Sequence, residues 1–593
     1  MRVTVEVADV NRNTVPTGGQ NVADCCSRGN GALDLVGLAT RGLNYLTRNP
    51  APNPNAALHY LPFFGGKIPL RGVPRFERTP WDYGDGTGRF LEALILCREM
   101  TGEQGGQHVD EALAHHLCSF LNEGDGLSYR PDTPWSEFGA DMWAQRGTLL
   151  ALSLLYERTG DEAIRGRLGR LVDGLASIAI RDQGSAYLRY FWTSDGWLTE
   201  ENAGICFCVL DGLVKCFEAT ANEKAMRLAI DLARGMIHRR PAYFHPDGSF
   251  GYPGMSERPE MPDVGGSDRI PEVAVAWEIA NGHVTSRVAA AAGMVRLGVL
   301  TGDREFIEAG KSVHDWVSTR GSQFGWIPEN LRTAGQESNE LCNLAGMLEI
   351  QVLLAVSGYP EYWDCAQRFV RNHLAASQFM VTPELLDLVQ SDVGRGLPVD
   401  SDRFSYSEVL SRLEGGFAGP TYPDDMFSAY PKSRQSPDAR RVIDISGCCA
   451  PSGVKALWLA WDSALTRDDR GIWVNLAMDH RSGYAAVESH LPREGRVDVT
   501  VMDQSPVHIR LPEWVKPSDA KLFVDGRETR LQTNGRYVIC QPGLEGRTLS
   551  IRYPVAVRRE QEVLAGIPYL VTWRGDTVAS VEAETPPILA LYK

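Results

Sequence analysis

Two short segments of this chain hold residues that bind soft metal ions. The segment ESNELCNLAG contains Glu340 and Cys342, two residues apart, and the segment DISGCCAPSG contains the adjacent Cys448 and Cys449. One carboxylate and three thiolates would complete a tetrahedral shell around zinc if the fold brings the segments together. A thiol bound to zinc is deprotonated near neutral pH, so one of the four residues could also serve as a nucleophile.

Simple burial of hydrophobic cysteines is the alternative interpretation. The chain has twelve cysteines, and a free cysteine packs like a small apolar residue. The local context favours chemistry, because each pair precedes an apolar run typical of a helix. These runs are NLAGMLEIQVLLAV after Cys342 and GVKALWLAWDSAL after Cys449. Loops that lead into helices often carry functional groups, and a helix N-terminus stabilises a thiolate.

The remaining close cysteine pairs give weaker signals. Cys206 and Cys208 form a C-x-C sequence, and on a helix residues two apart point in different directions. We therefore expect this pair to be buried rather than to bind metal. Cys25 and Cys26 lack a comparable start of a helix after them, and we leave them unassigned.

A short phrase recurs between amphipathic helical stretches and predicts the main architecture. It reads MTGE at 100–103, RTGD at 158–161, ATAN at 219–222, LTGD at 300–303 and VSGY at 356–359. Glycine suits the end of one helix, and Asp or Glu suits the first turn of the next. The repeat predicts helical hairpins, with a sixth near 455–466. We expect an (α/α)6 toroid, with an open helical solenoid as the alternative.

The pattern changes near residue 470. Runs such as GRVDVTVMD, VHIRLPEWV and TLSIRYPVAVR alternate apolar and polar residues between turn residues, which predicts a β-sandwich. We therefore divide the chain into an N-terminal strand segment at 1–20, a barrel at 21–468 and a β-sandwich at 469–593.

Composition excludes several classes of partner. The 593 residues are 43% hydrophobic and 23% charged, and the net charge is −15. An acidic chain without a basic run is unsuited to nucleic acid. We see no secretory signal and no membrane span, so we expect a cytoplasmic protein whose cysteines stay reduced. Assembly into a homo-oligomer is left open.

The order of these motifs resembles glycoside hydrolase family 127, the β-L-arabinofuranosidase family. The resemblance runs from about residue 280 to 575, through GHVTSRVAAAAGMVRLGVLTGD, NELCNLAG and IDISGCCAPSGVKAL to the strands ending at GRTLSIRYPVAVRREQEV. It implies a retaining glycosidase on an (α/α)6 barrel, with a zinc-bound cysteine nucleophile. Cys448 matches the nucleophile, while Glu340, Cys342 and Cys449 match the other zinc ligands.

The resemblance also suggests residues that contact the sugar. His283 matches a histidine that lines the family's sugar pocket, although a hydrogen-bonded histidine inside a helix is an equal alternative. Two other pocket histidines of the family are not evident here, so the sugar could differ from arabinofuranose. Trp326 lies in the GWIPENL segment, and we expect its ring to contact the sugar.

The family's general acid/base does not align, because the segment before Glu340 is short. Glu329 and Glu337 are the candidates. Glu329 lies beside Trp326 and Pro328, and this apolar setting would raise the pKa of its carboxyl as a general acid requires. Glu337 is three residues from Glu340, and it could cap the helix instead.

The segment TPWDYGDGTGRF offers further groups for binding a sugar. Trp81 could stack on a sugar ring, while the carboxylates of Asp82 and Asp85 could bind hydroxyls. An Asp- and Gly-rich turn with a packed tryptophan explains the same residues equally well.

Three other functions stay open at this stage. A sugar epimerase or a polysaccharide lyase would use His or Tyr bases rather than a Cys and Glu cluster. A non-catalytic carbohydrate-binding protein could hold zinc for structure alone, although structural zinc sites rarely include a carboxylate.

Overall fold

The computed structural model describes residues 33–50, 58–192, 205–251, 282–331, 337–389, 398–429, 434 and 440–592. The predicted N-terminal strand segment at 1–20 and the pair Cys25 and Cys26 lie outside these residues.

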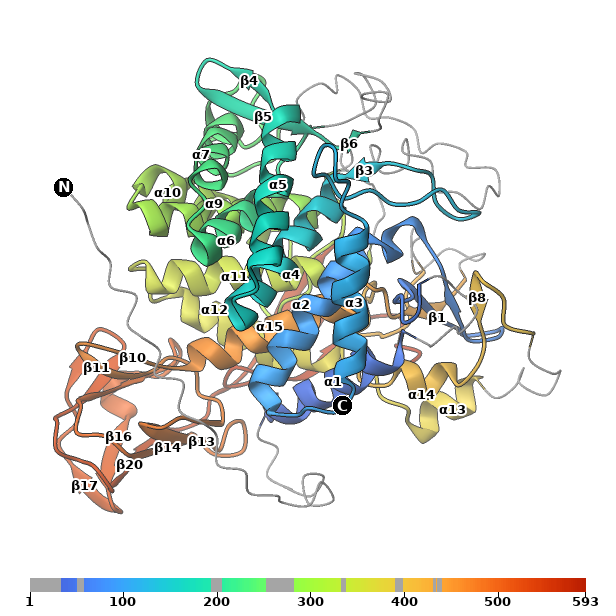
Figure 1. Ribbon diagram of the computed structural model, residues 1–593. Coiled ribbons are helices and arrows are strands. Elements are labelled where there is room, and N and C mark those ends of the chain that lie inside the picture. The colour runs from blue at the N-terminus through green and yellow to red at the C-terminus, as the bar shows by residue number, and fades with distance from the viewer. Residues whose placement is uncertain are drawn as a thin grey trace.

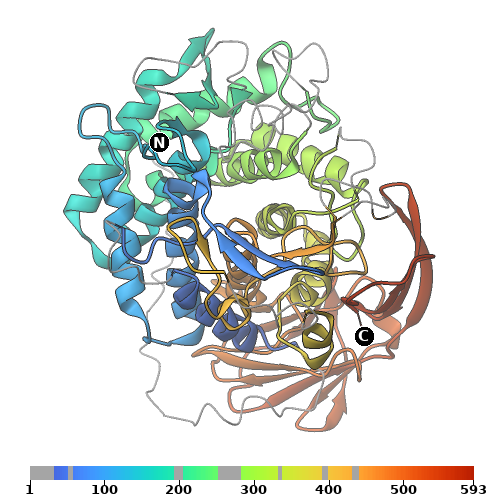
Figure 2. The same cartoon turned by 90° about the vertical axis from the view of Figure 1, so that its right-hand side faces the viewer.

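Six helices of the described chain form a closed inner ring. Each contacts the next one in chain order, and the last contacts the first. They are α2 (Gly84–Thr101), α4 (Met142–Thr159), α6 (Leu210–Thr220), α9 (Val284–Thr301), α11 (Leu341–Val356) and α15 (Cys449–Ala464). Figure 2 looks along this ring. The closed set of contacts confirms the predicted (α/α)6 toroid and excludes an open solenoid.

Six outer helices pack against the inner ring (Figure 1). They are α1 (Leu35–Arg48), α3 (Gln107–Ser119), α5 (Glu162–Ile178), α7 (Glu223–His238), α10 (Arg304–Ser318) and α12 (Tyr362–Phe369), the last continued by a π-helical turn at Val370–Leu374. Two short helices, α13 (Pro383–Val389) and α14 (Val409–Leu413), lie beside the ring.

The repeated phrases mark the turns from inner to outer helices. Gly102, Gly160 and Gly302 adopt the left-handed conformation, with φ between 64° and 73°, where each inner helix ends. Side chains cap the first turns of the outer helices α5, α7 and α10. Asn222, for example, accepts hydrogen bonds from the backbone N–H groups of the first turn of α7. Five inner helices are each followed by the outer helix of their hairpin, while α15 completes the sixth pair with α1.

A small sheet covers one end of the ring. Its strand order is β8-β2-β1-β9, built from β1 (Gly65–Pro69), β2 (Arg75–Glu77), β8 (Phe404–Ser405) and β9 (Val442–Asp444). Figure 2 shows it in front of the inner helices. We call this end the mouth, because β9 leads directly into α15. Two-residue strands β3 (Ala140–Asp141) and β6 (Phe191–Trp192) pair nearby, and β4 (Ile180–Asp182), β5 (Ser185–Arg189) and β7 (Ile205–Cys206) form another small sheet.

Two sheets near the C-terminus form the predicted sandwich. The five-stranded sheet has the order β10-β11-β15-β19-β18, and the six-stranded sheet has the order β12-β13-β14-β20-β16-β17. Alternating residues of both sheets, such as Val474 and Val499, share one hydrophobic core. The strands are β10 (Leu465–Asp468), β11 (Gly471–Val474), β12 (His480–Arg481), β13 (Ala485–Ser489), β14 (Arg496–Val501), β15 (Val507–Arg510), β16 (Lys521–Val524), β17 (Arg527–Thr529), β18 (Thr533–Asn534), β19 (Tyr537–Cys540) and β20 (Thr548–Arg552).

A separate three-stranded sheet ends the chain. It consists of β21 (Val557–Leu564), β22 (Ile567–Arg574) and β23 (Thr577–Glu582). Its inner face packs on Phe324 and Trp326 of the barrel. The first sandwich strand begins at Leu465, four residues before the predicted boundary at 469. No helix among the described residues is long and apolar enough to cross a membrane.

Candidate active site and metal centre

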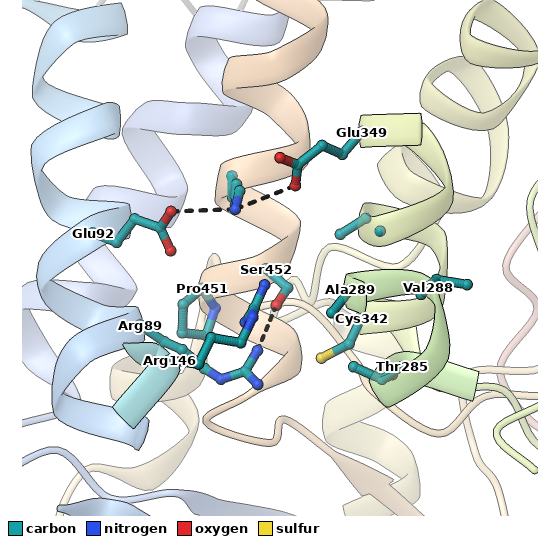
Figure 3. Close-up of a pocket in the computed structure, with 13 residues that line it drawn as sticks. Arg89, Glu92, Arg146, Thr285, Val288, Ala289, Cys342, Glu349, Pro451 and Ser452 are labelled. Carbon is teal, nitrogen blue, oxygen red and sulfur yellow. Dashed lines mark hydrogen bonds and ion pairs between the residues drawn. The ribbon is translucent and has the colours of Figure 1, made fainter. Parts of the chain in front are cut away.

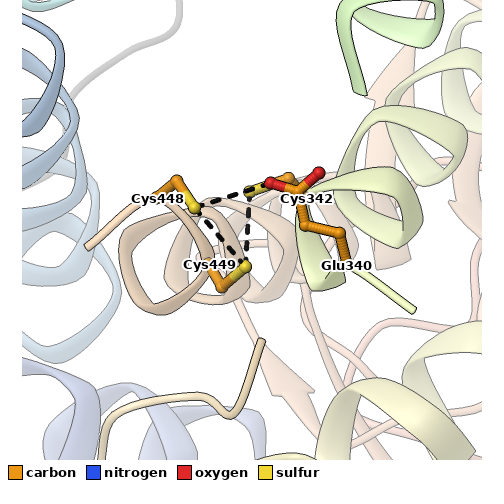
Figure 4. A group of neighbouring side chains, drawn as sticks. All are labelled: Glu340, Cys342, Cys448 and Cys449. Carbon is orange, nitrogen blue, oxygen red and sulfur yellow. Dashed lines mark hydrogen bonds between the residues drawn. The ribbon is translucent and has the colours of Figure 1, made fainter. Parts of the chain in front are cut away.

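The fold brings the four predicted metal ligands together at the mouth. One ligand atom from each of Glu340, Cys342, Cys448 and Cys449 lies within 4.8 Å of the others. Figure 4 shows the four side chains converging from two neighbouring helices. The Sγ atoms of Cys342 and Cys449 are 3.7 Å apart, and those of Cys448 and Cys449 are 3.6 Å apart. The Sγ atom of Cys448 lies 3.5 Å from Oε1 of Glu340.

The starts of two adjacent inner helices position these side chains. Glu340 is the residue before α11, and Cys448 is the residue before α15. The mouth sheet fixes the approach to α15, because the N–H of Gly447 donates to the carbonyl of Phe64 at 2.5 Å. Because the N-terminal end of a helix is the positive end of its dipole, both helix starts favour negative charge on the cluster.

The second carboxylate oxygen of Glu340 is held by its neighbours. Its Oε2 lies 2.9 Å from Nε2 of His283, and it accepts a hydrogen bond of 2.5 Å from the hydroxyl of Thr285. Thr285 also contacts Asn343, whose amide donates to the carbonyl of Pro328 at 2.9 Å. Partners of this kind orient the first ligands of a metal. His283 thus lies at the cluster, and its contact with a sugar stays a prediction.

The charges of the cluster are strongly coupled. Burial raises the pKa of Glu340, but the contacts with His283 and Thr285 outweigh it and bring the pKa to about 2. Burial likewise raises the pKa of Cys342, yet the hydrogen bonds from Cys448 and Cys449 bring it to about 5. The same contacts hold the pKa of Cys448 well above its usual value. The three thiols thus shift one another's pKa values in opposite directions.

The donor set fits zinc. Bonds of about 2.3 Å from zinc to sulfur place the sulfurs of a tetrahedral site about 3.8 Å apart, which agrees with the separations of 3.6 and 3.7 Å. Thiolates are soft ligands that zinc prefers, and zinc also accepts a carboxylate oxygen beside them. A divalent cation among them would also remove the mutual repulsion that keeps Cys448 protonated.

A buried arginine, not predicted from the sequence, lies near the cluster. Arg89 of α2 pairs with Asp85 at 2.6 Å and donates to Ser452 at 3.3 Å. Its charge acts on Cys342 and Cys448. The sequence signal that could have identified it is the spacing of four residues between Asp85 and Arg89, which places both on one face of a helix.

Below the cluster, the axis of the ring is filled by charged side chains (Figure 3). Lys455 lies 3.2 Å from Glu92 and 3.3 Å from Glu349. The cavity between them measures about 30 Å³, which is room for one or two water molecules. A sugar must therefore reach the cluster from the mouth.

The two candidate acids lie on either side of the segment before α11. The backbone of Glu329 pairs with Val284 and with Ser338, so it lies between the segments that carry His283 and Glu340. A carboxylate oxygen of Glu337 accepts a hydrogen bond of 3.0 Å from the N–H of Arg434. Both side chains are buried. Glu329 stays the preferred acid, because its backbone lies between the two segments that carry His283 and Glu340.

Both predicted sugar-binding carboxylates are buried, and the protein binds one of them on both oxygens. Asp82 is 0% exposed and accepts hydrogen bonds from Phe64, Thr79 and Arg78. Burial raises its pKa to about 6, even though Arg78 opposes the shift. Asp85 is buried against Arg89. The assignment of Asp82 is corrected, because both of its carboxylate oxygens already accept hydrogen bonds from the protein. Sugar binding by Asp85 stays a prediction.

Trp81 is partly exposed, as stacking on a sugar ring would require. Its ring is half-buried and lies 5.8 Å from the ring of Phe64. The carbonyl of Phe64 in turn holds Gly447, the residue before Cys448. Sugar binding by Trp81 stays a prediction.

Trp326 does not face the site. It is 0% exposed, and its indole N–H donates to the carbonyl of Thr421 at 3.1 Å. It packs between the barrel and the three-stranded sheet. The predicted contact with a sugar is therefore corrected to a role in packing.

Cys206 and Cys208 are buried, as expected, but not on a helix. Cys206 ends β7, and the two Sγ atoms are 3.3 Å apart. Among the described residues, the only group suited to a metal is the one formed by Glu340 and the three cysteines. All ten cysteines in the described chain are free thiols.

Comparison with solved structures shows which proteins share this fold. A GH127 β-L-arabinofuranosidase from Geobacillus stearothermophilus T6 aligns over 91% of this chain and 80% of its own, with a TM-score of 0.55 and 13% identity. A second GH127 β-arabinofuranosidase aligns over 93% and 81%, with a TM-score of 0.56 and 13% identity. The fold is that of these glycosidases.

A third structure, described only as a glycoside hydrolase, covers 87% of this chain and 83% of its own, with a TM-score of 0.54 and 15% identity. The shared fold agrees with the resemblance that the sequence motifs show. No protein-family model and no curated protein sequence matches the chain.

Proposed function

We propose that this protein is a retaining glycoside hydrolase with Cys448 as its nucleophile. The observation that carries the proposal is the Glu340 and cysteine cluster at the mouth of the ring. Cys342 and Cys449 are buried, whereas Cys448 is partly exposed. A sugar entering from the mouth would therefore meet Cys448 before Cys342 or Cys449.

Each residue has a distinct role in the proposed reaction. The thiolate of Cys448 attacks the anomeric carbon, while Glu329 donates a proton to the departing oxygen. Water then attacks the same carbon and releases the thiolate, with the carboxylate of Glu329 accepting the proton of the water. Two successive displacements retain the configuration of the anomeric carbon.

The four cluster residues would hold zinc. When bound, zinc lowers the pKa of the thiols and stabilises the thiolate that departs in the second step. The contacts of His283 and Thr285 with Glu340 keep that carboxylate oriented. Arg89 adds a positive charge that interacts favourably with the ionised forms of Cys342 and Cys448.

The substrate class follows from the entry to the site and from the proteins with the same fold. The mouth side carries the half-buried Trp81, and aromatic rings of this kind pack on sugar rings. We propose a small glycoside or oligosaccharide ending in β-L-arabinofuranose as the first candidate, because two neighbours in fold act on β-arabinofuranosides by name.

A panel of 4-nitrophenyl furanosides and pyranosides tests the proposal. We expect one class to be hydrolysed, with NMR showing that the first sugar released keeps its anomeric configuration. Cys448→Ser should be nearly inactive, since a serine hydroxyl is not ionised at neutral pH. Inversion of configuration, or full activity of Cys448→Ser, would contradict the proposed mechanism.

A further inference from the structure

One buried amide beside the cluster has no role in the protein's own hydrogen bonding. Asn330 is 3% exposed. Neither its Nδ2 nor its Oδ1 atom has a hydrogen-bond partner in the described structure. Buried polar groups of native proteins are nearly always paired, so an exception calls for an explanation such as a ligand.

Backbone pairing places this amide next to His283. The N–H of Val284 donates to the carbonyl of Glu329, and the N–H of Leu331 donates to the carbonyl of Gly282. These two bonds flank His283 and Asn330, which form an antiparallel bridge without hydrogen bonds to each other. In such a pair the two side chains lie closest together and leave the backbone on the same side.

The His283 side chain extends from this side of the backbone to the cluster. Its Nε2 atom lies 2.9 Å from Glu340, one of the four cluster residues. The amide of Asn330 thus leaves the backbone on the side from which the imidazole reaches the cluster.

Asn343, a second asparagine near the cluster, differs from Asn330 because its amide is hydrogen-bonded within the protein. The amide of Asn343 donates to the carbonyl of Pro328, and its oxygen contacts Thr285. Asn343 therefore holds the segment in place, whereas Asn330 on the same segment holds nothing in the protein.

We infer that Asn330 binds two neighbouring hydroxyl groups of the sugar ring that reacts with Cys448. An amide offers a donor and an acceptor side by side. Its N–H would donate to one hydroxyl, and its carbonyl would accept a hydrogen bond from the next. The inference rests on the proposed glycosidase function and adds that the substrate carries a free vicinal diol on the ring.

The test combines a variant of the same shape with substrates that lack one hydroxyl. The substrates are 4-nitrophenyl β-L-arabinofuranoside and its 2-deoxy and 3-deoxy analogues. We expect Asn330→Leu to lower kcat/KM for the parent glycoside about 10–100-fold. We also expect the loss of at least one hydroxyl to cost much less in Asn330→Leu than in the wild type. Equal costs in both proteins would overturn the inference.

Thermal unfolding separates binding from a structural role. Because the amide is unpaired, Asn330→Leu should leave the Tm unchanged or raise it. Asn372→Leu is the matched control, since the Asn372 amide is fully paired with Arg368, Asp576 and Val578. Its Tm should fall. A fall in the Tm of Asn330→Leu as large as that of the control would assign Asn330 to the structure instead.

Sugar binding by Asn330 can be tested even if the protein is not a glycoside hydrolase. If the wild type hydrolyses no glycoside of the panel, binding of methyl β-L-arabinofuranoside is measured by saturation-transfer NMR. If the wild type binds the sugar and Asn330→Leu does not, the result would support sugar binding by Asn330 but not the proposed hydrolysis. Equal binding to both proteins, or to neither, would overturn it.

Discussion

Cys342 and Cys449 are buried side chains whose surroundings suit a metal ligand better than a packed thiol. Their sulfurs are 3.7 Å apart, and they share the cluster with a carboxylate whose pKa is about 2. We expect the purified protein to contain about one zinc per chain, because the cluster supplies four ligands. Elemental analysis should show that Cys342→Ser loses most of this metal.

Cys216→Ser is the control for metal content. Cys216 is a buried thiol outside the cluster, beside Thr220, so this variant should keep its zinc. Stoichiometric metal in Cys342→Ser, or none in the wild type, would contradict the four-residue site.

Glu329 and Glu337 can be told apart by the leaving group of the substrate. Removal of a general acid matters when the leaving group is a poor one, and typically costs ~10²–10⁴-fold. We expect Glu329→Ala to lose activity in this range on an alkyl glycoside and far less in the glycosylation of an activated nitrophenyl glycoside. Azide should rescue its second step.

Glu337→Ala serves as the comparison, because the Glu337 carboxylate already accepts a hydrogen bond from Arg434. If Glu337→Ala alone shows dependence on the leaving group and rescue by azide, the acid is Glu337.

The sequence predicted the cluster but not its surroundings. Tight spacing and ligand type identified Glu340 and the three cysteines, since these properties are local. Asp82 and Trp326 were misassigned because burial decides their roles. Their partners, Phe64 and Thr421, lie 18 and 95 residues away. The role of Asn330 could not be predicted from the sequence, because it is inferred from a side-chain amide that has no hydrogen-bond partner in the folded protein.

At the scale of elements, the inner ring depends on close contact between neighbouring helices. A Cβ atom on Gly88 of α2 would lie 2.4 Å from the backbone of Gly147 in α4. We expect Gly88→Ala to force the two helices apart and to destabilise the protein by at least about 1–3 kcal/mol. A lower Tm, with reduced soluble expression, would show this.

Gly105→Ala is the matched control, because no atom lies within 4 Å of a Cβ at that position. Its stability should change by less than about 0.5 kcal/mol. Equal Tm values for the two variants would mean that the contact between α2 and α4 is not tight.

Helical hairpins were predictable, but the mouth sheet was not. Most turns from an inner to an outer helix carry a local signal, either a left-handed glycine after α2, α4 and α9 or a capping side chain before α5, α7 and α10. The mouth sheet instead pairs Lys67 with Asp444, which are far apart in the chain. Short strands carry little periodic signal, so only the fold reveals that β1 positions the start of α15.

At the scale of the whole molecule, the barrel and the sandwich are joined by a buried ion pair. Nη1 of Arg510 in β15 lies 2.5 Å from Oδ1 of Asp364 in α12, and both side chains are 2% exposed. We expect Arg510→Ala to cost on the order of 3–5 kcal/mol, because it leaves a buried carboxylate without its cation. Thermal unfolding should show the loss.

Arg510→Met combined with Asp364→Leu should recover part of this stability, since neither charge is then left alone. A Tm for Arg510→Ala equal to that of the wild type would show that the two parts are not coupled through this pair.

Covalent labelling of the nucleophile tests the central claim most directly. The wild type would be treated with a cyclophellitol-type trap of the sugar that the panel identifies, and the labelled peptide sequenced by mass spectrometry. We predict one label per chain, on Cys448, and none in Cys448→Ser. A label on Cys449 or on a carboxylate would contradict the proposed role of Cys448.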